Sequence, residues 1–196
     1  MLQLLDEARA ELEIKKSRFI AIAYPTKTLE EAKEKVLYTK DQYKDATHVV
    51  HASVVGDKGT MFSFSDDKEP KNTAGRPAFE VLKGSGITNI TVCIVRYFGG
   101  TLLGTGGLVK AYGDSTKEVL KVARTEELVE RTSFSLLLDY DDYALIKRAL
   151  SSLNVANVIE DFGTRITIKG MVSNDQKDKL IKQALDIGQG KIEIIS

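Results

Sequence analysis

The chain has 196 residues, 42% hydrophobic and 29% charged, and its 28 Lys and Arg balance its 28 Asp and Glu. A chain of this length forms one sizeable domain or two small ones. Zero formal net charge argues against a protein that coats nucleic acid through bulk positive charge, and no apolar run approaches the roughly 20 residues that span a bilayer. One cysteine, Cys93, rules out an internal disulfide framework, so we expect a cytoplasmic protein without membrane contact.

The first two thirds of the chain alternate strand and helix patterns. Residues 8–16 and 17–25 predict two strands, and residues 28–43 have helical spacing with acidic residues in the first turn. Residues 46–56 and 60–65 predict two more strands, before a polar loop over 65–77. A short helix over 77–86, an apolar strand over 89–98 and a helix from Gly106 to Arg124 follow.

The last third has a different pattern, strand, helix, hairpin around Gly163, helix, strand. This β-α-β-β-α-β order is typical of the ferredoxin-like, split β-α-β arrangement. The sequence therefore predicts an α+β protein with two domains, residues 1–131 and 132–196.

The segment RYFGGTLLGTGGLVKAYG, residues 96–113, contains six glycines. It matches neither a P-loop, since no Lys-Ser or Lys-Thr follows, nor the Rossmann fingerprint, since Val109 stands in place of the third glycine. A strand, a glycine turn and a helix would leave free N–H groups near Gly104 to Leu108, where an anion is favoured. The alternative is that the glycines only permit tight packing between strand and helix. If the backbone turns sharply or approaches something closely here, at least one of Gly99, Gly100, Gly104, Gly106 and Gly107 should have a positive φ.

The helix after this segment has one apolar and one basic face. The inward stripe comprises Leu108, Tyr112, Thr116, Val119 and Ala123, and the opposite face carries Lys110, Lys117, Lys121 and Arg124 around Asp114. The basic face is either a solvated surface with ion pairs such as Lys110 with Asp114, or a ridge for phosphate groups.

No catalytic constellation stands out. His48 and His51 should point to opposite faces of one strand, and Cys93 suits a core. Asp66, Asp67 and Glu69 could hold a cation, but such runs are typical of solvated turns. We therefore expect a protein that is not an enzyme and has no cofactor and no metal.

Four sequence blocks resemble the signature of the IMPACT family: SDDKEP, TAGRP, RYFGG and LGTGGLVKAYG, at residues 65–70, 73–77, 96–100 and 103–113. The segments KKSRFIA and ATH fit the same family, although Lys68 and Asn72 stand where glycine is common. The resemblance covers essentially the full chain. It implies a first domain of the ribosomal-protein type with a left-handed β-α-β crossover, similar to domain IV of elongation factor G, and a second domain similar to domain V of that factor.

The resemblance also implies a role in translation, since eukaryotic relatives of the first domain regulate translation by competing for a protein partner of a stress kinase. Three functions stay open. The first is a non-enzymatic regulator that binds the ribosome, RNA or a translation factor, the second an enzyme that binds a nucleotide or another phosphorylated ligand, and the third a protein-docking module. The oligomeric state stays open too, and a monomer is compatible with the sequence.

We expect the binding residues to form one shallow cleft, bracketed by Arg76 and Arg96 with Asp66 and Asp67 on its rim. Strand alternation should place Arg96 and Phe98 on one face and Tyr97 on the other. If RNA binds, Arg76, Arg96 and Lys110 should contribute more than Lys117, Lys121 and Arg124. The full predicted set is Asp66, Asp67, Thr73, Gly75, Arg76, Arg96, Tyr97, Phe98, Gly99, Gly100, Gly104, Thr105, Gly106, Gly107 and Lys110.

Overall fold

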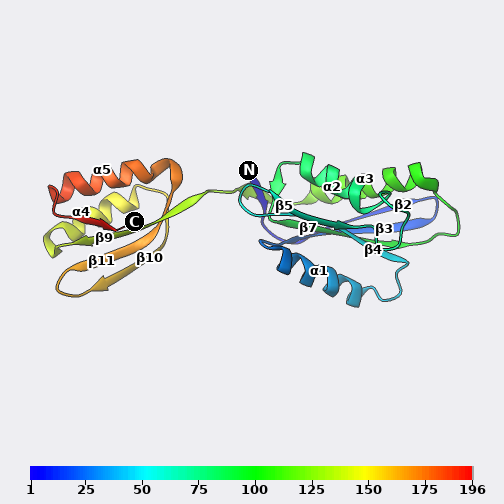
Figure 1. Cartoon of the computed structure of the whole chain (residues 1–196), viewed down its shortest axis with the longest axis horizontal. Coiled ribbons are helices and arrows are strands. Elements are labelled where there is room, and N and C mark those ends of the chain that lie inside the picture. The colour runs from blue at the N-terminus through cyan, green and yellow to red at the C-terminus, as the bar shows by residue number, and fades with distance from the viewer. Residues whose placement is uncertain (196) are drawn as a thin grey trace. The chain divides into compact units, whose positions relative to one another are not determined.

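The computed structural model describes residues 1–195, and the chain forms two compact units, Met1–Leu128 and Val129–Ser196. Both units combine helices with mainly antiparallel sheets, as Figure 1 shows, which confirms the α+β prediction. The division lies close to the boundary expected at Arg131. None of the helices within residues 1–195 is long and apolar enough to cross a membrane.

The first unit is built on a five-stranded sheet in the order β2-β3-β7-β4-β5. Its strands are β2 (Ala8–Ile14), β3 (Ser17–Pro25), β4 (His48–Val55), β5 (Met61–Ser65) and β7 (Ile90–Tyr97), and its helices are α1 (Leu29–Gln42), α2 (Gly75–Gly84) and α3 (Gly104–Val122). β3 and β4 both pair antiparallel with β7 and therefore run parallel to each other, with α1 as the connection between them.

Helices cover both faces of this sheet: α1 lies on one face, and α2 and α3 lie on the other (Figure 1). The central strand β7 shows why both faces are apolar. Val92 and Ile94 join the core beneath α2 and α3, whereas Cys93 and Val95 join the core beneath α1. The prediction of a strand buried on both faces is confirmed.

The three helices of this unit begin differently. Thr28 caps α1, since its side chain accepts a hydrogen bond from the N–H of Glu31. Asp66, nine positions before the first residue of α2, accepts hydrogen bonds from the N–H groups of Ala74 and Gly75 at the start of that helix. The N-cap residue of α3 is Leu103, which offers no side-chain acceptor, and the first turn holds no acidic residue.

A second, three-stranded sheet in this unit was absent from the sequence prediction. β1 (Leu2–Leu4) pairs with β6 (Ile87–Thr88) on one side and with β8 (Thr125–Glu127) on the other. Strands of two or three residues carry no measurable alternation, and their partners are distant in sequence. The predicted helix end at Arg124 is also corrected. The helix α3 ends at Val122, because the chain then leaves it to form the short strand β8, which local spacing does not mark.

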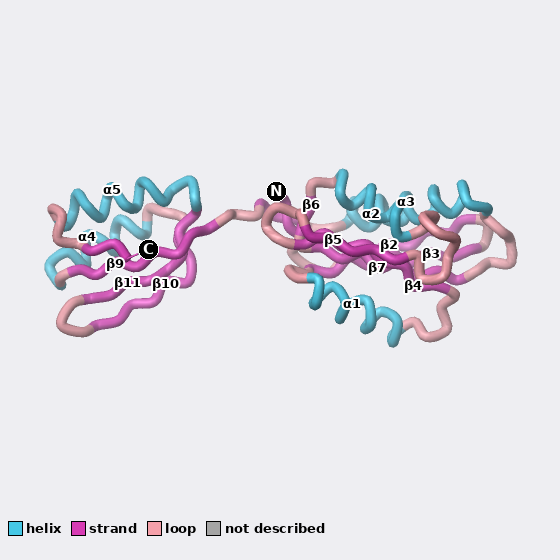
Figure 2. Tube along the Cα trace, viewed as in Figure 1, coloured by secondary structure: helices cyan, strands magenta, loops and turns pink. Residues whose placement is uncertain are grey.

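The second unit has the predicted β-α-β-β-α-β order. Its elements are β9 (Arg131–Leu138), α4 (Tyr140–Ser151), β10 (Val155–Phe162), β11 (Ile166–Ser173), a short 3-10 helix (Asn174–Gln176), α5 (Lys177–Gly188) and β12 (Glu193–Ile195). The strands lie in the antiparallel order β10-β11-β9-β12, and α4 and α5 cover one face of the sheet (Figure 2). Leu136, Ile146 and Ile168 are central to the core between the two layers.

Candidate ligand-binding site

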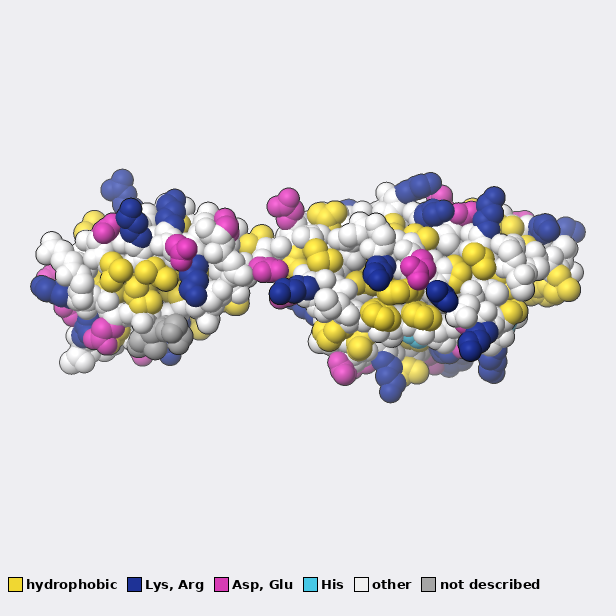
Figure 3. All heavy atoms as spheres, turned by 45° about the horizontal axis from the view of Figure 1, so that its top comes forward, with side chains coloured by type: hydrophobic (Ala, Val, Ile, Leu, Met, Phe, Trp, Pro, Cys, Tyr) yellow, Lys and Arg dark blue, Asp and Glu magenta, His cyan; other side chains and the backbone are white. Residues whose placement is uncertain are grey.

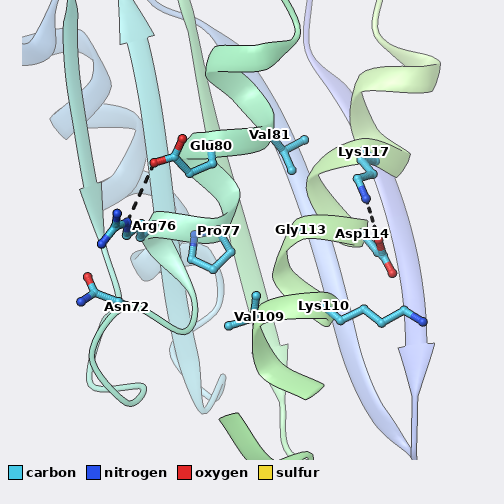
Figure 4. A pocket seen from close by; sticks show the side chains of 10 residues that line it. All are labelled: Asn72, Arg76, Pro77, Glu80, Val81, Val109, Lys110, Gly113, Asp114 and Lys117. Atoms are coloured by element: carbon cyan, nitrogen blue, oxygen red, sulfur yellow. Dashed lines mark hydrogen bonds and ion pairs between the residues drawn. The ribbon is translucent and has the colours of Figure 1, made fainter. Parts of the chain in front are cut away.

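Two hollows open on the first unit. The first, which we call the loop groove, has a volume of about 410 Å³ and is lined by Thr47, His48, Glu69, Pro70, Arg96, Phe98, Leu102, Leu103, Gly104, Thr105 and Leu108. The second, the helix hollow, has a volume of about 620 Å³ and is lined by Asn72, Arg76, Pro77, Glu80, Val81, Val109, Lys110, Gly113, Asp114 and Lys117 (Figure 4). Residues from the first turns of α3 line both.

The predicted residues are divided between these hollows. Arg96, Phe98, Gly104 and Thr105 line the loop groove. Arg76 and Lys110 line the helix hollow instead. The prediction that Arg76 and Arg96 bracket a single cleft is therefore wrong: α2 turns Arg76 outward, where it pairs with Glu80 at 3.9 Å.

Asp66 holds the loop before α2 in place. One carboxylate oxygen accepts from the N–H groups of Ala74 and Gly75 at 3.0 and 2.8 Å, and the other accepts from the N–H of Asn72 at 2.8 Å. Asp66 lines neither hollow. The placement of Asp66 on the rim of a binding cleft is corrected, because its oxygens satisfy helix and loop donors.

Asp67 joins the same loop to the sheet and to α1. Its carboxylate accepts from the N–H of Val49 at 2.8 Å and from the ammonium group of Lys40. Partial burial would raise the pKa of Asp67, but the hydrogen bonds from Lys40 and Val49 outweigh burial and hold this pKa below its ordinary value. Asp67 is thus an ionised structural anchor, and its placement on a cleft rim is also corrected.

Glu69 is buried, contrary to the expectation of a solvated acidic turn. Its residue surface is 8% exposed, and its Oε1 accepts from Arg96 Nη1 at 2.5 Å and from the Tyr112 hydroxyl at 2.7 Å. Burial, and then the charge of Glu69, raise the pKa of Tyr112 above its ordinary value, so the hydroxyl remains a donor. The partners of Glu69 stand on β7 and α3, so the loop is fastened into the fold through this carboxylate.

Arg96 is 5% exposed and its charge is matched by Glu69. Its guanidinium carbon lies 5.5 Å from the ring centre of Phe19 and 5.7 Å from that of Phe98. Its Nε is buried without a hydrogen-bond partner among the described residues. The prediction of Arg96 as a main phosphate contact is corrected, because an inward position on the central strand makes it a buried, paired cation.

His48 lines the loop groove beside Glu69. Its Nδ1 lies 2.8 Å from the carbonyl oxygen of Asp67 and its Nε2 lies 3.8 Å from Oε2 of Glu69. A carbonyl oxygen can only accept, so Nδ1 carries a proton. In the neutral imidazole the Nε2 is consequently an acceptor, beside a carboxylate oxygen that is also an acceptor.

The glycines of residues 96–113 have different structural roles. Gly100 and Gly104 have φ values of +81° and +74°, which confirms the predicted left-handed conformation. A Cβ on Gly99 would overlap the backbone of Lys16, so this glycine permits a close approach within the domain. Gly106 has neither property, since its φ is not positive and an added Cβ would meet no atom within 4 Å.

The remaining predicted residues line neither hollow. The Thr73 hydroxyl donates to the carbonyl of Pro70 at 2.6 Å. The Tyr97 hydroxyl donates to Asp45 at 3.0 Å, and its ring packs in the core on the α1 side of the sheet. Tyr97 therefore lies on the face opposite Arg96 and Phe98, as predicted. A Cβ on Gly75 would crowd the backbone of Ser65 at 2.6 Å, and Gly107 is held close to Leu103.

The basic face of α3 is largely neutralised by ion pairs. Lys117 pairs with Asp114 at 3.1 Å, Lys121 with Glu118 at 2.6 Å and Arg124 with Asp6 at 3.1 Å. Asp114 therefore pairs with Lys117 rather than with Lys110, and Lys110 has no ion pair among the described residues. Figure 4 shows the Lys110 side chain extending alone beside this pair, and in the view of Figure 3 Lys and Arg side chains are spread between hydrophobic ones rather than gathered in one patch.

Sequence reasoning left several residues of the loop groove out of the predicted site. Glu69 and His48 are polar residues whose partners lie more than 20 positions away or on another strand, so no local pattern marks them. Leu102 and Leu103 lie inside the glycine-rich segment and could have been found there. Leu102 is 82% exposed, which is unusual for so large an apolar side chain.

Comparisons with known proteins agree on one family. The family described as the Impact N-terminal domain matches residues 15–120. An IMPACT family member from Haemophilus influenzae is 37% identical, over 91% of this chain and 94% of its own length, and IMPACT family member YigZ from Escherichia coli is 34% identical, over 94% and 91%. The crystal structure of a hypothetical protein, 32% identical, covers 100% of this chain and 96% of its own, with a TM-score of 0.74.

Proposed function

We propose that this chain, which belongs to the IMPACT family, regulates translation without catalysing a reaction, by binding RNA of the translation machinery at the loop groove. The family supplies the link to translation, through the role that the resemblance implies. The resemblance also leads us to propose, at the level of fold, the left-handed crossover and the likeness to domains IV and V of elongation factor G.

One observation supports RNA as the partner: the exposed ring of Phe98 and the uncapped start of α3 line the same groove. Phe98 is 45% exposed, which suits stacking on an unpaired base. No described residue bonds to the N–H groups of Gly104, Thr105 or Gly106, and such groups at a helix N-terminus attract a phosphate. Beyond the groove, Lys110 is a nearby cation that no acidic side chain neutralises among the residues described.

Sedimentation with ribosomes tests this proposal. The protein should move with ribosomal fractions in a sucrose gradient at low salt, and ribonuclease treatment should release it. Absence from every ribosomal fraction at low salt would contradict the proposal.

A matched pair of lysines on α3 tests the RNA contact itself. Lys110→Ala should weaken RNA binding and reduce its salt slope by about one unit, because an unpaired lysine can replace a counterion at a phosphate. Lys121→Ala is the control, since Lys121 is already paired with Glu118 at 2.6 Å and should change binding little. Binding is measured by fluorescence anisotropy across a salt series. Equal losses would indicate a diffuse basic surface and not a defined contact.

A second candidate function is supported by the apolar part of the same groove. Leu102 is 82% exposed and Leu103 stands beside it, while Glu69 cancels the charge of Arg96. These features suit a protein partner. A protein complex would survive ribonuclease and would weaken little with added salt, whereas phosphate contacts weaken steeply.

A further inference from the structure

We propose that the loop groove binds one nucleotide and that guanine is the base it prefers. The inference rests on the proposed function, because the natural ligand would be one unit of the bound RNA. A free guanine nucleotide carries the same chemistry, and the experiment below separates the two sources.

The acceptors on the groove wall come from two side chains. Glu69 is 8% exposed, and its Oε1 already accepts two hydrogen bonds, whereas its Oε2 accepts none from the described residues. The Nε2 of His48 lies 3.8 Å from Oε2, which is too long for a hydrogen bond. The bond between Nδ1 and the Asp67 carbonyl makes Nε2 an acceptor in the neutral ring. Two adjacent acceptors in a buried wall favour a ligand with N–H or O–H donors, because a buried acceptor without a donor costs free energy.

Guanine fits this pair better than the other bases. Its Watson–Crick edge presents two neighbouring donors, N1–H and the N2 amino group, so one can reach Oε2 of Glu69 and the other Nε2 of His48. Adenine and cytosine offer one amino donor beside a ring acceptor, and uracil offers one N–H between two carbonyls. On these three bases at least one acceptor would face an acceptor of the protein.

The other end of the groove suits a phosphate. The N–H groups of Gly104, Thr105 and Gly106 donate to no acceptor among the described residues, and the helix dipole favours negative charge there. A helix N-terminus alone would not define a site. The buried Glu69 carboxylate on the same groove is the independent observation, because its Oε2 selects a ligand that carries hydrogen-bond donors.

Dimensions and packing agree with such a ligand. The groove volume of about 410 Å³ lies within the range of small-molecule pockets. Phe98 supplies an exposed aromatic wall, and Leu103 and Leu108 supply apolar ones. An aromatic ring next to donors and acceptors is the composition that holds an unstacked base.

Calorimetric titration of the full chain with the four nucleoside 5′-monophosphates tests the base. We expect GMP to bind more tightly than UMP by about tenfold, the value of one well-formed hydrogen bond to a charged group. Guanosine should bind more weakly than GMP, since it lacks the phosphate. Equal affinity for the four nucleotides, or no binding of any, would overturn the inference.

A matched pair at Gly106 tests the phosphate end without disturbing the buried network. A side chain at this position meets open space, so both variants should fold. Gly106→Asp places a negative charge in the first turn of α3, whereas Gly106→Asn places a neutral side chain of the same shape there. We expect GMP to bind the Asp variant about tenfold more weakly than the Asn variant. Equal affinities would exclude α3 as the phosphate site and overturn the proposal.

Short oligoribonucleotides identify the source of the ligand. A pentamer with one central guanine should bind more tightly than GMP if the natural ligand is RNA, and no more tightly if it is a free nucleotide; either result supports the site. If the protein sediments with ribosomes but binds no nucleotide, this inference fails and the proposed function stands. If GMP binds but ribosomes do not, the proposed function fails and the nucleotide site stands.

Discussion

The decisive residue of the site is Glu69, because it joins the loop before α2 to the central strand and to α3. Its carboxylate is buried, and its compensation comes from Arg96 and Tyr112. A buried ion pair contributes little net stability, but the loss of one partner leaves a charge without compensation. The main role of Arg96 is consequently to stabilise the folded state by compensating the charge of Glu69.

Arg96→Ala should lower the free energy of unfolding by about 3–5 kcal/mol, because it leaves the Glu69 carboxylate buried without its cation. Urea denaturation measures the change. The double variant Arg96→Met with Glu69→Leu should recover a large part of the loss, since it removes both charges together. A single variant as stable as the wild type would show that water reaches the carboxylate.

His51 makes stability depend on pH. Burial, and next the positive charge of Lys40, lower the pKa of His51, and the charge of Asp67 opposes them only in part. Because the folded protein favours the neutral ring, the unfolded chain binds more protons below the ordinary pKa of about 6.5. The free energy of unfolding should therefore fall as the pH drops below about 6.5, down to the lowered pKa.

The variant His51→Gln tests this dependence. Urea denaturation at pH 7.5 and 5.5 should show a smaller difference for the variant than for the wild type, because glutamine does not titrate. An unchanged difference would assign the dependence to other groups.

Among the three helices of the first unit, α3 is the one whose first turn has no side-chain acceptor among the described residues. Thr28 caps α1 and Asp66 caps α2, whereas the N-cap residue of α3, Leu103, has no acceptor and the first turn of α3 contains three glycines. The glycines of the segment 99–107 are not equivalent, since only some of them are required by the fold of the domain. A pair of alanine substitutions separates the two kinds.

Gly99→Ala should destabilise the protein by about 1–3 kcal/mol or more, because the new Cβ would overlap the carbonyl group of Lys16. Gly106→Ala should stabilise it by about 0.5–1 kcal/mol, because alanine favours the helix and meets open space. Thermal denaturation measures both variants. If Gly106→Ala destabilised the protein as much as Gly99→Ala, a side chain at residue 106 would not be pointing into open space.

At the scale of the whole molecule, the chain divides into two units that have separate cores. Phe19, Ile94 and Tyr112 belong to the core of the first unit, and Leu136 and Ile168 belong to that of the second. A unit that has its own hydrophobic core can in principle fold by itself. The second unit is small for an independent domain, so its margin of stability should be narrower.

We expect a fragment of residues 1–128 to fold alone and to keep its nucleotide site. Circular dichroism should show a cooperative thermal transition for this fragment, and calorimetry should give the same affinity for GMP as the full chain. The fragment 129–196 should melt at a lower temperature and bind no nucleotide. Loss of the cooperative transition in residues 1–128 would show that the second unit is needed to complete the first.

The sequence by itself determined the elements with strong periodicity and the family. β7, α1 and the β-α-β-β-α-β order of the second unit could be predicted because apolar spacing, caps and turns are local properties. The left-handed glycines and the opposite faces of Arg96 and Tyr97 followed from the same local rules. Motif order alone carried the resemblance, which the comparisons confirmed.

Only the tertiary structure decided which predicted residues share a site. Charge in a sequence does not show whether a cation is free, so Arg96 looked like a phosphate contact until Glu69, 27 positions earlier, was found beside it. The separation of Arg76 from Arg96 and the pairing of β1 with β6 and β8 also depend on contacts between distant segments. The physical reason is the same in each case: burial and pairing are properties of neighbours in space, and the local pattern of a chain does not specify them.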